Sequence, residues 1–229
     1  MLTSNINMKC MLLAAGLGER LRPITDKIPK PLVKVAGKPL IEYHLENLKS
    51  AGFKEVVINL SHLGEMIEEH LGDGSRFDLA IEYSHEGAKP LETAGGIIRA
   101  LPLLGDKPFL VLNADIWCNH SLSFANLTHG KLAHIVLVDN PAHNPDGDFV
   151  YEFGRVYNTG SNHLTFGGIG IYDPSLFKDF AVEKRALAPL LRDAIDQELV
   201  SAEYFTGKWF DIGTQDRLAQ TESFVSKVN

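Results

Sequence analysis

The chain is poor in cysteine and has no long apolar run. Its 229 residues include only two cysteines, Cys10 and Cys118. They predict no disulfide framework and lack metal-ligand spacing. No stretch approaches the roughly 20 apolar residues of a membrane span, and residues 1–7 lack the basic and apolar regions of a secretory signal. We therefore expect a cytoplasmic protein without a membrane anchor, with Cys10 in the core.

Positive charge is also scarce. Lys and Arg total 22 against 29 Asp and Glu, a net charge of −7. A general nucleic-acid binder needs a basic surface, so this balance argues against that class, whereas a small-molecule phosphate site needs only local cations. None of the nine histidines has zinc-ligand spacing, and no Gly-x-Ser-x-Gly elbow supports serine hydrolysis. No broad apolar surface stripe is evident, so we expect a monomer.

The first half alternates between two hydrophobic periods. This alternation predicts strands joined by helices in a mostly parallel, doubly wound α/β sheet. The expected strands are Lys9–Leu13, Glu55–Leu60, Leu79–Ser84 and Phe109–Leu112, and the expected helices are Pro39–Ser50, Leu63–Leu71 and Gly95–Leu104, the last interrupted by Pro102.

The second half is less regular. It predicts strands at Ala133–Val138 and Leu164–Tyr172, a hairpin at Gly147–Tyr157, helices at Leu187–Ile195 and Thr214–Ser226, and segments Glu203–Phe205 and Trp209–Ile212 flanking a turn. No linker or repeat divides the chain. We therefore expect one domain over 1–229, with a first half at 8–115 that supplies the ligand-binding face of the sheet, a second half at 116–229 that inserts a small substrate lid, and a disordered tail at 1–7.

A glycine loop rich in cations follows the first expected strand. Gly16 and Gly18 precede Arg20, and a proline-stiffened connection leads to Lys30. Small residues let backbone N–H groups approach a phosphate, and Arg and Lys supply the positive charge. No third glycine stands at Leu21, which excludes the dinucleotide fingerprint, and no Gly-Lys-Ser/Thr follows, which excludes a Walker loop. The segment predicts a grip on a nucleoside triphosphate.

Two aspartates end expected strands in distant parts of the chain. Asp115 follows Phe109–Leu112, and Asp211 lies in Trp209–Thr214 before a Gly-Thr turn. Open α/β sheets bind ligands beyond the carboxyl ends of their strands. Carboxylates there can hold Mg²⁺, which takes few protein ligands and bridges phosphates. Each aspartate alone is also compatible with a helix cap, so the Mg²⁺ hypothesis rests on their convergence.

Together these segments resemble the sugar-phosphate nucleotidyltransferases, the nucleoside-diphosphate-sugar pyrophosphorylases. The matching units, in order, are Leu12–Pro23, Pro29–Leu32, Gly37–Leu40, Leu112–Asp115 and Trp209–Thr214. The resemblance implies the nucleotide-diphospho-sugar transferase fold, an α/β fold with a single Rossmann-like, doubly wound mixed sheet and a small inserted sugar-binding lid. It also implies transfer of UMP from UTP to a sugar 1-phosphate with Mg²⁺ as cofactor.

The resemblance implies roles residue by residue. They are catalytic for Arg20 and Lys30; nucleotide-binding for Ala14, Ala15, Gly16, Gly18, Glu19, Arg20, Lys30, Glu92 and Gly95; sugar-binding for Asn113, Asn140, Asp148 and Gly168; and metal-binding for Asp115 and Asp211. This chain departs from the pattern twice. Ala94 replaces a glycine found in the most similar type of member, and no Glu-Lys-Pro unit supplies the lid lysine that commonly faces the sugar phosphate.

Several alternatives remain open on sequence alone. Within the family they are glucose-1-phosphate thymidylyl- or uridylyltransferases and mannose- or heptose-1-phosphate guanylyltransferases, because one methyl group separates thymine from uracil. No hexapeptide repeat supports an added acyltransferase domain. An inactive nucleotide-sugar-binding regulatory module would be expected to lose Lys30, Asp115 or Asp211, and all three are present. A Rossmann dehydrogenase lacks support from the glycine spacing.

Overall fold

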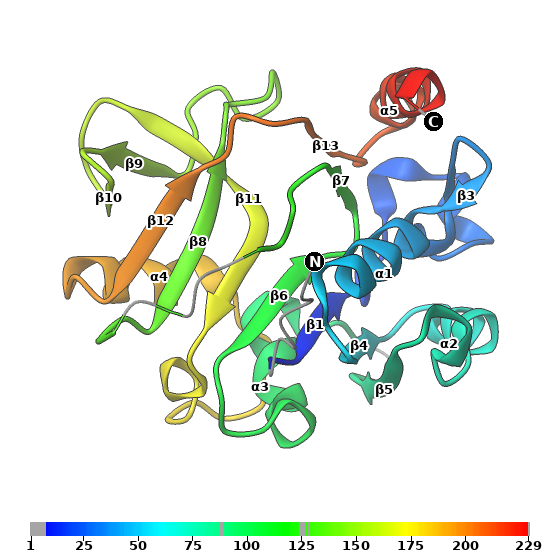
Figure 1. Ribbon diagram of the computed structural model, residues 1–229, viewed down its shortest axis with the longest axis horizontal. Coiled ribbons are helices and arrows are strands. Elements are labelled where there is room, and N and C mark those ends of the chain that lie inside the picture. Colours follow the sequence, from blue (N-terminus) through cyan, green and yellow to red (C-terminus); the bar gives the residue numbers. More distant parts are fainter. Residues whose placement is uncertain (1–7, 88, 124–126, 128, 229) are drawn as a thin grey trace.

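The computed structural model describes residues 8–87, 89–123, 127 and 129–228, so the tail predicted at 1–7 lies outside the described residues. A nine-stranded sheet forms its centre (Figure 1). Its strands are β1 (Cys10–Leu13), β4 (Glu55–Leu60), β5 (Ala80–His85), β6 (Phe109–Asn113), β8 (Ala133–Val138), β9 (Phe149–Glu152), β10 (Arg155–Tyr157), β11 (His163–Tyr172) and β12 (Val200–Tyr204). Two small sheets pair β2 (Lys34–Val35) with β3 (Lys38–Pro39) and β7 (Ile116–Cys118) with β13 (Trp209–Asp211).

The sheet is mixed, with a parallel and an antiparallel part. The principal order is β10-β9-β11-β6-β1-β4-β5, and β8 joins β11 to β12. In the first half, β1 pairs in parallel with β4 and β6, which places Cys10 between Val56 and Leu110. Strand β11, from the second half, pairs antiparallel with β6 of the first half and with β8 and β9. The alternating first half is therefore parallel as predicted, and the mixed sheet implied by the resemblance is confirmed.

Helices cover both faces of the sheet. They are α1 (Leu40–Ala51) and α2 (Gly64–Leu71) on one face and α3 (Glu92–Leu104) and α4 (Leu187–Asp196) on the other, whereas α5 (Gln215–Val228) packs elsewhere. Met11 belongs to one buried cluster with α3 and α4, whereas Cys10 and Leu12 belong to a second with α1 and α2. The alternation of side chains along a strand explains this division. Both faces are buried, so β1 is apolar throughout, and Cys10 is fully buried as predicted.

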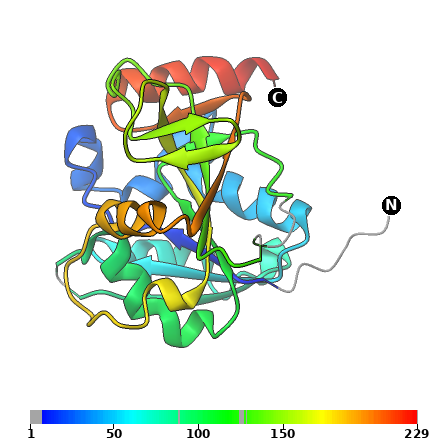
Figure 2. The ribbon, with the colours of Figure 1, turned by 90° about the vertical axis from the view of Figure 1, so that its left-hand side faces the viewer.

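A third, smaller cluster holds α5 at the end of the molecule opposite α3 (Figure 2). Val35 and Leu40 pack there against Ile212 and Val225. The hydroxyl oxygen of Thr214 accepts a hydrogen bond from the Arg217 backbone N–H at 3.4 Å, which supports its predicted role as the N-cap of α5. Among the described residues, no helix is long and apolar enough to cross a membrane.

One local prediction was wrong. Helix α3 begins at Glu92 rather than Gly95 and continues through Pro102 to Leu104. Its first turn is stabilised from a distance, because the carbonyl oxygen of Arg185 accepts hydrogen bonds from the N–H groups of Ala94 and Gly95. The two segments expected to flank a turn do lie on either side of a bend at Gly207, and they enter different sheets: β12 pairs with β8, and β13 pairs with β7.

Glu203 on β12 joins two histidines, and this cluster predicts an acid-dependent stability. Its carboxylate lies 2.6 Å from His120 Nε2 and 3.7 Å from His134 Nε2. Hydrogen bonds to His120 and His134 lower the pKa of Glu203 from its usual 4.5 to about 2. Between these two pH values the unfolded chain binds the extra proton, so the stabilisation is complete above pH 4.5 and is lost as the pH falls toward 2.

We therefore expect Glu203→Gln to destabilise the protein at neutral pH. The difference in unfolding free energy from wild type should shrink as the pH falls below 4.5. Urea unfolding at a series of pH values measures it, with the exposed Glu65→Gln as control. A difference that stays constant from pH 7 to pH 3 would contradict this role.

Candidate active site

A cavity of about 190 Å³ opens at the carboxyl ends of β1, β4 and β6. Leu13 and Asn113, the last residues of β1 and β6, line it together with Asn59 near the end of β4. The Asn59 side-chain oxygen accepts a hydrogen bond from Ala14 N–H at 2.7 Å, which positions the start of the glycine loop. The other lining residues are Ala14, Ala15, Gly16, Lys30, Pro31, Glu86, Pro90, Glu92, Thr93 and Asp115.

The glycine loop turns back so that Lys30 reaches this cavity. Gly18 has φ +64°, and a Cβ there would lie 2.8 Å from the Thr25 side chain, so glycine suits both the turn and the close approach. Lys30 begins the short 3₁₀ helix Lys30–Leu32 and is only 8% exposed. Its ammonium group lies 2.6 Å from Asp115 Oδ2. A buried cation thus stands beside a carboxylate at the mouth of the cavity.

Not every residue assigned to the nucleotide lines this cavity. Ala14, Ala15, Gly16, Lys30 and Glu92 do. Gly18 does not line it and instead allows the close approach of the loop to Thr25. Glu19 and Arg20 lie exposed on the turn Glu19–Leu21 and do not line it, and a Cβ on Gly95 would lie 2.2 Å from the Glu183 carbonyl oxygen. Gly95 therefore serves close packing of α3 against the chain before α4.

A buried polar pair at the floor of the cavity was missed in the sequence. Glu86 accepts hydrogen bonds from Asn59 Nδ2 and from Leu91 N–H, both at 2.6 Å. A Cβ on Gly96 would lie 2.4 Å from Glu86 Oε1, so glycine at 96 leaves room for this carboxylate. The available signal was the amide of Asn59 at the end of an apolar strand, because buried polar groups require partners.

Ala94 does not alter the cavity. Its side chain is fully buried in the cluster shared by α3 and α4, and it is absent from the cavity lining. Its neighbours Glu92 and Thr93 are the residues of this helix that face the opening. The extra methyl group relative to glycine is therefore taken up by the core.

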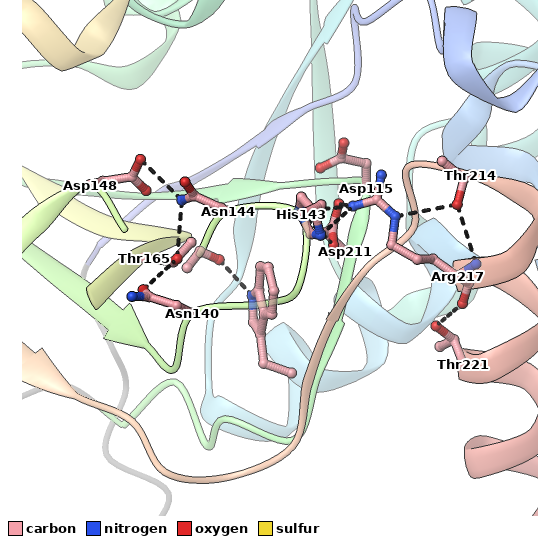
Figure 3. Close-up of polar contacts among 12 residues, drawn as sticks. Asp115, Asn140, His143, Asn144, Asp148, Thr165, Asp211, Thr214, Arg217 and Thr221 are labelled. Atoms are coloured by element: carbon pink, nitrogen blue, oxygen red, sulfur yellow. Dashed lines mark hydrogen bonds and ion pairs between the residues drawn. The ribbon is translucent and has the colours of Figure 1, made fainter. Parts of the chain in front are cut away.

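Backbone pairing brings Asp115 and Asp211 together, although they are far apart in sequence. Asp211 lies opposite Ile116 in the β7–β13 pair, and Ile212 N–H donates to the Asp115 carbonyl oxygen at 2.8 Å. Figure 3 shows both aspartates in one region of the molecule. Each carboxylate has a cation beside it: Lys30 for Asp115, and Arg217 for Asp211.

Two residues beside Asp211 were not singled out in the sequence. Arg217, in the first turns of α5, forms an ion pair with Asp211, and His143 Nε2 lies 3.4 Å from Asp211 Oδ1 (Figure 3). Arg217 also contacts His143 Nε2 at 2.9 Å. Asp211 and Arg217 are six residues apart, a spacing that matches no sequence motif for an ion pair. His143 comes from a loop that is distant in sequence. A basic residue in the first turn of a helix, where the helix dipole disfavours it, was the only local signal for Arg217.

His44 adds no positive charge to this region at neutral pH. It lies buried on α1, beneath the segment of Asp115 and Ile116. Burial lowers its pKa from 6.5 to about 4, against the opposing effects of a backbone hydrogen bond with Ile116 and of the charge on Asp115. The cations that neutralise Asp115 and Asp211 are therefore Lys30 and Arg217.

A second cavity of about 420 Å³ adjoins the first and shares Glu92, Thr93 and Asn113 with it. Of the residues assigned to the sugar, Asn113 and Asp148 line it. The remaining lining residues are Phe149, Phe166, Ala186, Leu187, Ala188, Leu191 and Arg192.

The other two residues assigned to the sugar, Asn140 and Gly168, contact other parts of the protein and do not line the second cavity. Asn140 accepts a hydrogen bond from Thr165 at 2.9 Å (Figure 3). It also donates to the His163 carbonyl oxygen, and both contacts tie its loop to β11. A Cβ on Gly168, where φ is +73°, would lie 2.7 Å from the Asn113 side chain. Neither residue lines either cavity.

Two carboxylates at or near the first cavity suit a hard divalent cation: Asp115 lines this cavity, and Asp211 lines neither cavity but lies next to Asp115 through the β7–β13 pair. Asp115 and Asp211 offer carboxylate oxygens, which Mg²⁺ prefers, and Mg²⁺ commonly takes only one or two protein carboxylates. No cluster of three or more His, Cys, Asp or Glu that could hold a metal occurs in the part of the chain that is described. Such a site would thus depend on ligands from bound phosphates.

Comparison with known proteins gives a consistent result. The sequence model of the family "Nucleotidyl transferase" matches residues 9–150. N-acetylmuramate alpha-1-phosphate uridylyltransferase of Neisseria meningitidis is 51% identical, covering 94% of this chain and 97% of that protein. Mannose-1-phosphate guanylyltransferase catalytic subunit beta of Danio rerio is 31% identical, covering 90% of this chain and 61% of the relative.

Among solved structures, a Bacillus anthracis protein assigned as a glucose-1-phosphate thymidylyltransferase, in complex with sucrose, has a TM-score of 0.85. The match covers 97% of this chain and 96% of that chain at 20% identity, so it bears on the fold alone. The family match and the 51% identity over most of the chain show the family to which the chain belongs. The chain belongs to the sugar-phosphate nucleotidyltransferase family.

Proposed function

We propose that the protein transfers UMP from UTP to N-acetylmuramic acid α-1-phosphate, releasing pyrophosphate and forming the UDP-sugar. The observation that carries this proposal is the 51% identity, over nearly the full length of both chains, to a relative named for that acceptor and for uridylyl transfer. N-acetylmuramic acid is a building block of peptidoglycan. We therefore assign the reaction to cell-wall recycling in the cytoplasm, where UTP is available.

The reaction needs charge neutralisation more than proton transfer. A phosphate oxygen of the sugar 1-phosphate attacks the α-phosphorus of UTP, and the bond to pyrophosphate breaks with its electron pair leaving on pyrophosphate. The attacking oxygen is already anionic at pH 7, so no general base is required. The difficulty is to hold two polyanions together in line, which positioned cations overcome.

This chain's residues fit those needs in the following way. Lys30, buried beside Asp115, would neutralise charge at the α-phosphate. Arg20 lies exposed on the glycine-loop turn, and within the described ranges it has no ion pair, so it is available for the triphosphate tail. Mg²⁺ held by Asp115 and Asp211 would supply positive charge to phosphate oxygens when bound. The second cavity would hold the acceptor sugar, and the protein would act as a monomer.

A grid of nucleotides and acceptors tests the proposal. Pyrophosphate release would be measured with UTP, dTTP and GTP, each with the 1-phosphates of N-acetylmuramic acid, N-acetylglucosamine, glucose and mannose. We expect the highest kcat/KM with UTP and N-acetylmuramic acid 1-phosphate. A strong preference for glucose 1-phosphate, or for GTP with mannose 1-phosphate, would replace this function with one of the other activities in the family.

A further inference from the structure

The second cavity has one cationic side chain on its wall. Arg192 lines it from α4, and Glu92 and Asn113, which also line this cavity, belong to the lining of the first cavity as well. The other charged residues on the lining, Glu92 and Asp148, are acidic. An anionic group on a sugar seated there would therefore meet positive charge only at Arg192 among the lining residues.

Arg192 is also available for an anion. Across residues 8–87, 89–123, 127 and 129–228, no carboxylate forms an ion pair with it, whereas Lys30, the cation of the first cavity, is paired with Asp115. Its guanidinium donates to the Asp148 carbonyl oxygen at 3.0 Å and to Asn158 Oδ1 at 3.4 Å. An arginine has five N–H groups, so donors remain.

The arginine is held in place by its surroundings. Its guanidinium carbon lies 5.0 Å from the centre of the Phe149 ring, and Phe149 is itself buried at the cavity wall. Stacking on an aromatic ring and a hydrogen bond to a backbone carbonyl restrict the side chain before a ligand arrives. A restricted guanidinium loses less entropy on binding a carboxylate.

We propose that Arg192 reads the carboxylate of the acceptor sugar and so selects a sugar acid over its neutral counterparts. The inference rests on the proposed function, because N-acetylmuramic acid differs from N-acetylglucosamine by a lactyl ether that ends in a carboxylate. With the sugar phosphate directed toward Lys30 and Asp115, the sugar ring occupies the second cavity and the lactyl group extends toward α4. The guanidinium then binds the carboxylate with two parallel hydrogen bonds.

The test pairs a change in the protein with a change in the substrate. Wild type and Arg192→Gln are each assayed with UTP and two acceptors: N-acetylmuramic acid 1-phosphate and its carboxamide, which keeps the shape and removes the charge. Where turnover is too slow, the Ki of each acceptor as a competitor is measured instead. We expect wild type to prefer the carboxylate by about 10- to 100-fold, the range of a charge-assisted hydrogen bond.

Arg192→Gln should lose that preference by weakening only the carboxylate acceptor, with the KM for UTP unchanged. Arg192→Lys should keep part of it, since charge remains but the planar fork does not. Arg76→Gln is the matched control, because Arg76 also stacks on a phenylalanine, 4.5 Å from the Phe77 ring centre, and lines neither cavity. Thermal unfolding of each variant checks folding.

The outcomes separate this inference from the proposed function. If wild type turns over neither acceptor but accepts another sugar 1-phosphate, the proposed function fails and the inference falls with it. If wild type uses the muramic acid acceptor without preferring its carboxylate, the inference alone is overturned. The same holds if Arg192→Gln keeps the preference or lowers kcat/KM equally for both acceptors. The comparison of the two acceptors with wild type tests the inference even if Arg192→Gln does not fold.

Discussion

Replacing Lys30 with alanine is expected to lower kcat by about 10²-fold or more, the usual cost of losing one transition-state contact. Lys30 is 8% exposed, and its ammonium group lies 2.6 Å from Asp115 Oδ2. In so buried a position, water does not readily replace the positive charge that the variant loses. As the bond to pyrophosphate breaks, negative charge develops on the oxygen that leaves the α-phosphorus, and a fixed cation beside the α-phosphate stabilises that charge. The effect should therefore fall on kcat, with a smaller change in the KM for UTP.

Steady-state pyrophosphate release at saturating substrates measures this effect. Lys34→Ala is the control, because Lys34 is exposed on β2 and close in sequence. Removing Lys30 also leaves Asp115 without its cation, so Lys30→Met and a thermal unfolding curve show whether the loss is one of chemistry or of folding. Turnover near the wild-type rate in a folded Lys30 variant would remove Lys30 from the mechanism.

Asp211→Asn is expected to reduce kcat/KM by about 10²-fold and to raise the Mg²⁺ concentration for half-maximal activity about tenfold or more. Neutralising one of two neighbouring carboxylates removes half of the protein's anionic charge at the proposed Mg²⁺ site. The variant also releases Arg217, whose ion pair with Asp211 is described above. A free guanidinium would repel the cation and add to the loss.

Activity titrated with MgCl₂ at fixed UTP measures the second effect. Asp216→Asn is the matched control, because Asp216 is an exposed aspartate at the start of α5. We expect the control to titrate like wild type. An unchanged Mg²⁺ requirement in Asp211→Asn, with activity lost or kept, would show that Asp211 is not a metal ligand.

Local pattern predicted most of the fold, because its elements bury one continuous face each. The expected strand Glu55–Leu60 and the expected strand Ala133–Val138 match β4 and β8 in their bounds. The wrong start of α3 and the strand pairings that the sequence did not predict both depend on distant segments. The start of α3 depends on the Arg185 carbonyl oxygen, and the partners of β12 and β13 are strands earlier in the chain. The residues next to these contacts in sequence show no pattern that would predict them.

Some residues of the candidate site could be predicted from the sequence, and others could not. The glycine loop, Lys30 and the two aspartates occur at the ends of expected strands or in motifs, so sequence could propose them. Arg217 and Arg192 occur on amphipathic helices among other charged residues, and only the packing of α4 and α5 shows which of those charges face a cavity or a carboxylate. Charge on a helix surface is too common to indicate a site without that placement.

The pairing of β7 with β13 has a consequence for when the enzyme acquires activity. Asp115 is synthesised well before Asp211, roughly a hundred residues earlier, which at ordinary rates of translation corresponds to about 5–20 s. Until β13 has paired with β7, a nascent chain carries the glycine loop and Lys30 with only one of the two carboxylates. The proposed pair of carboxylates is therefore complete only once the last quarter of the chain has been synthesised and β13 has paired with β7.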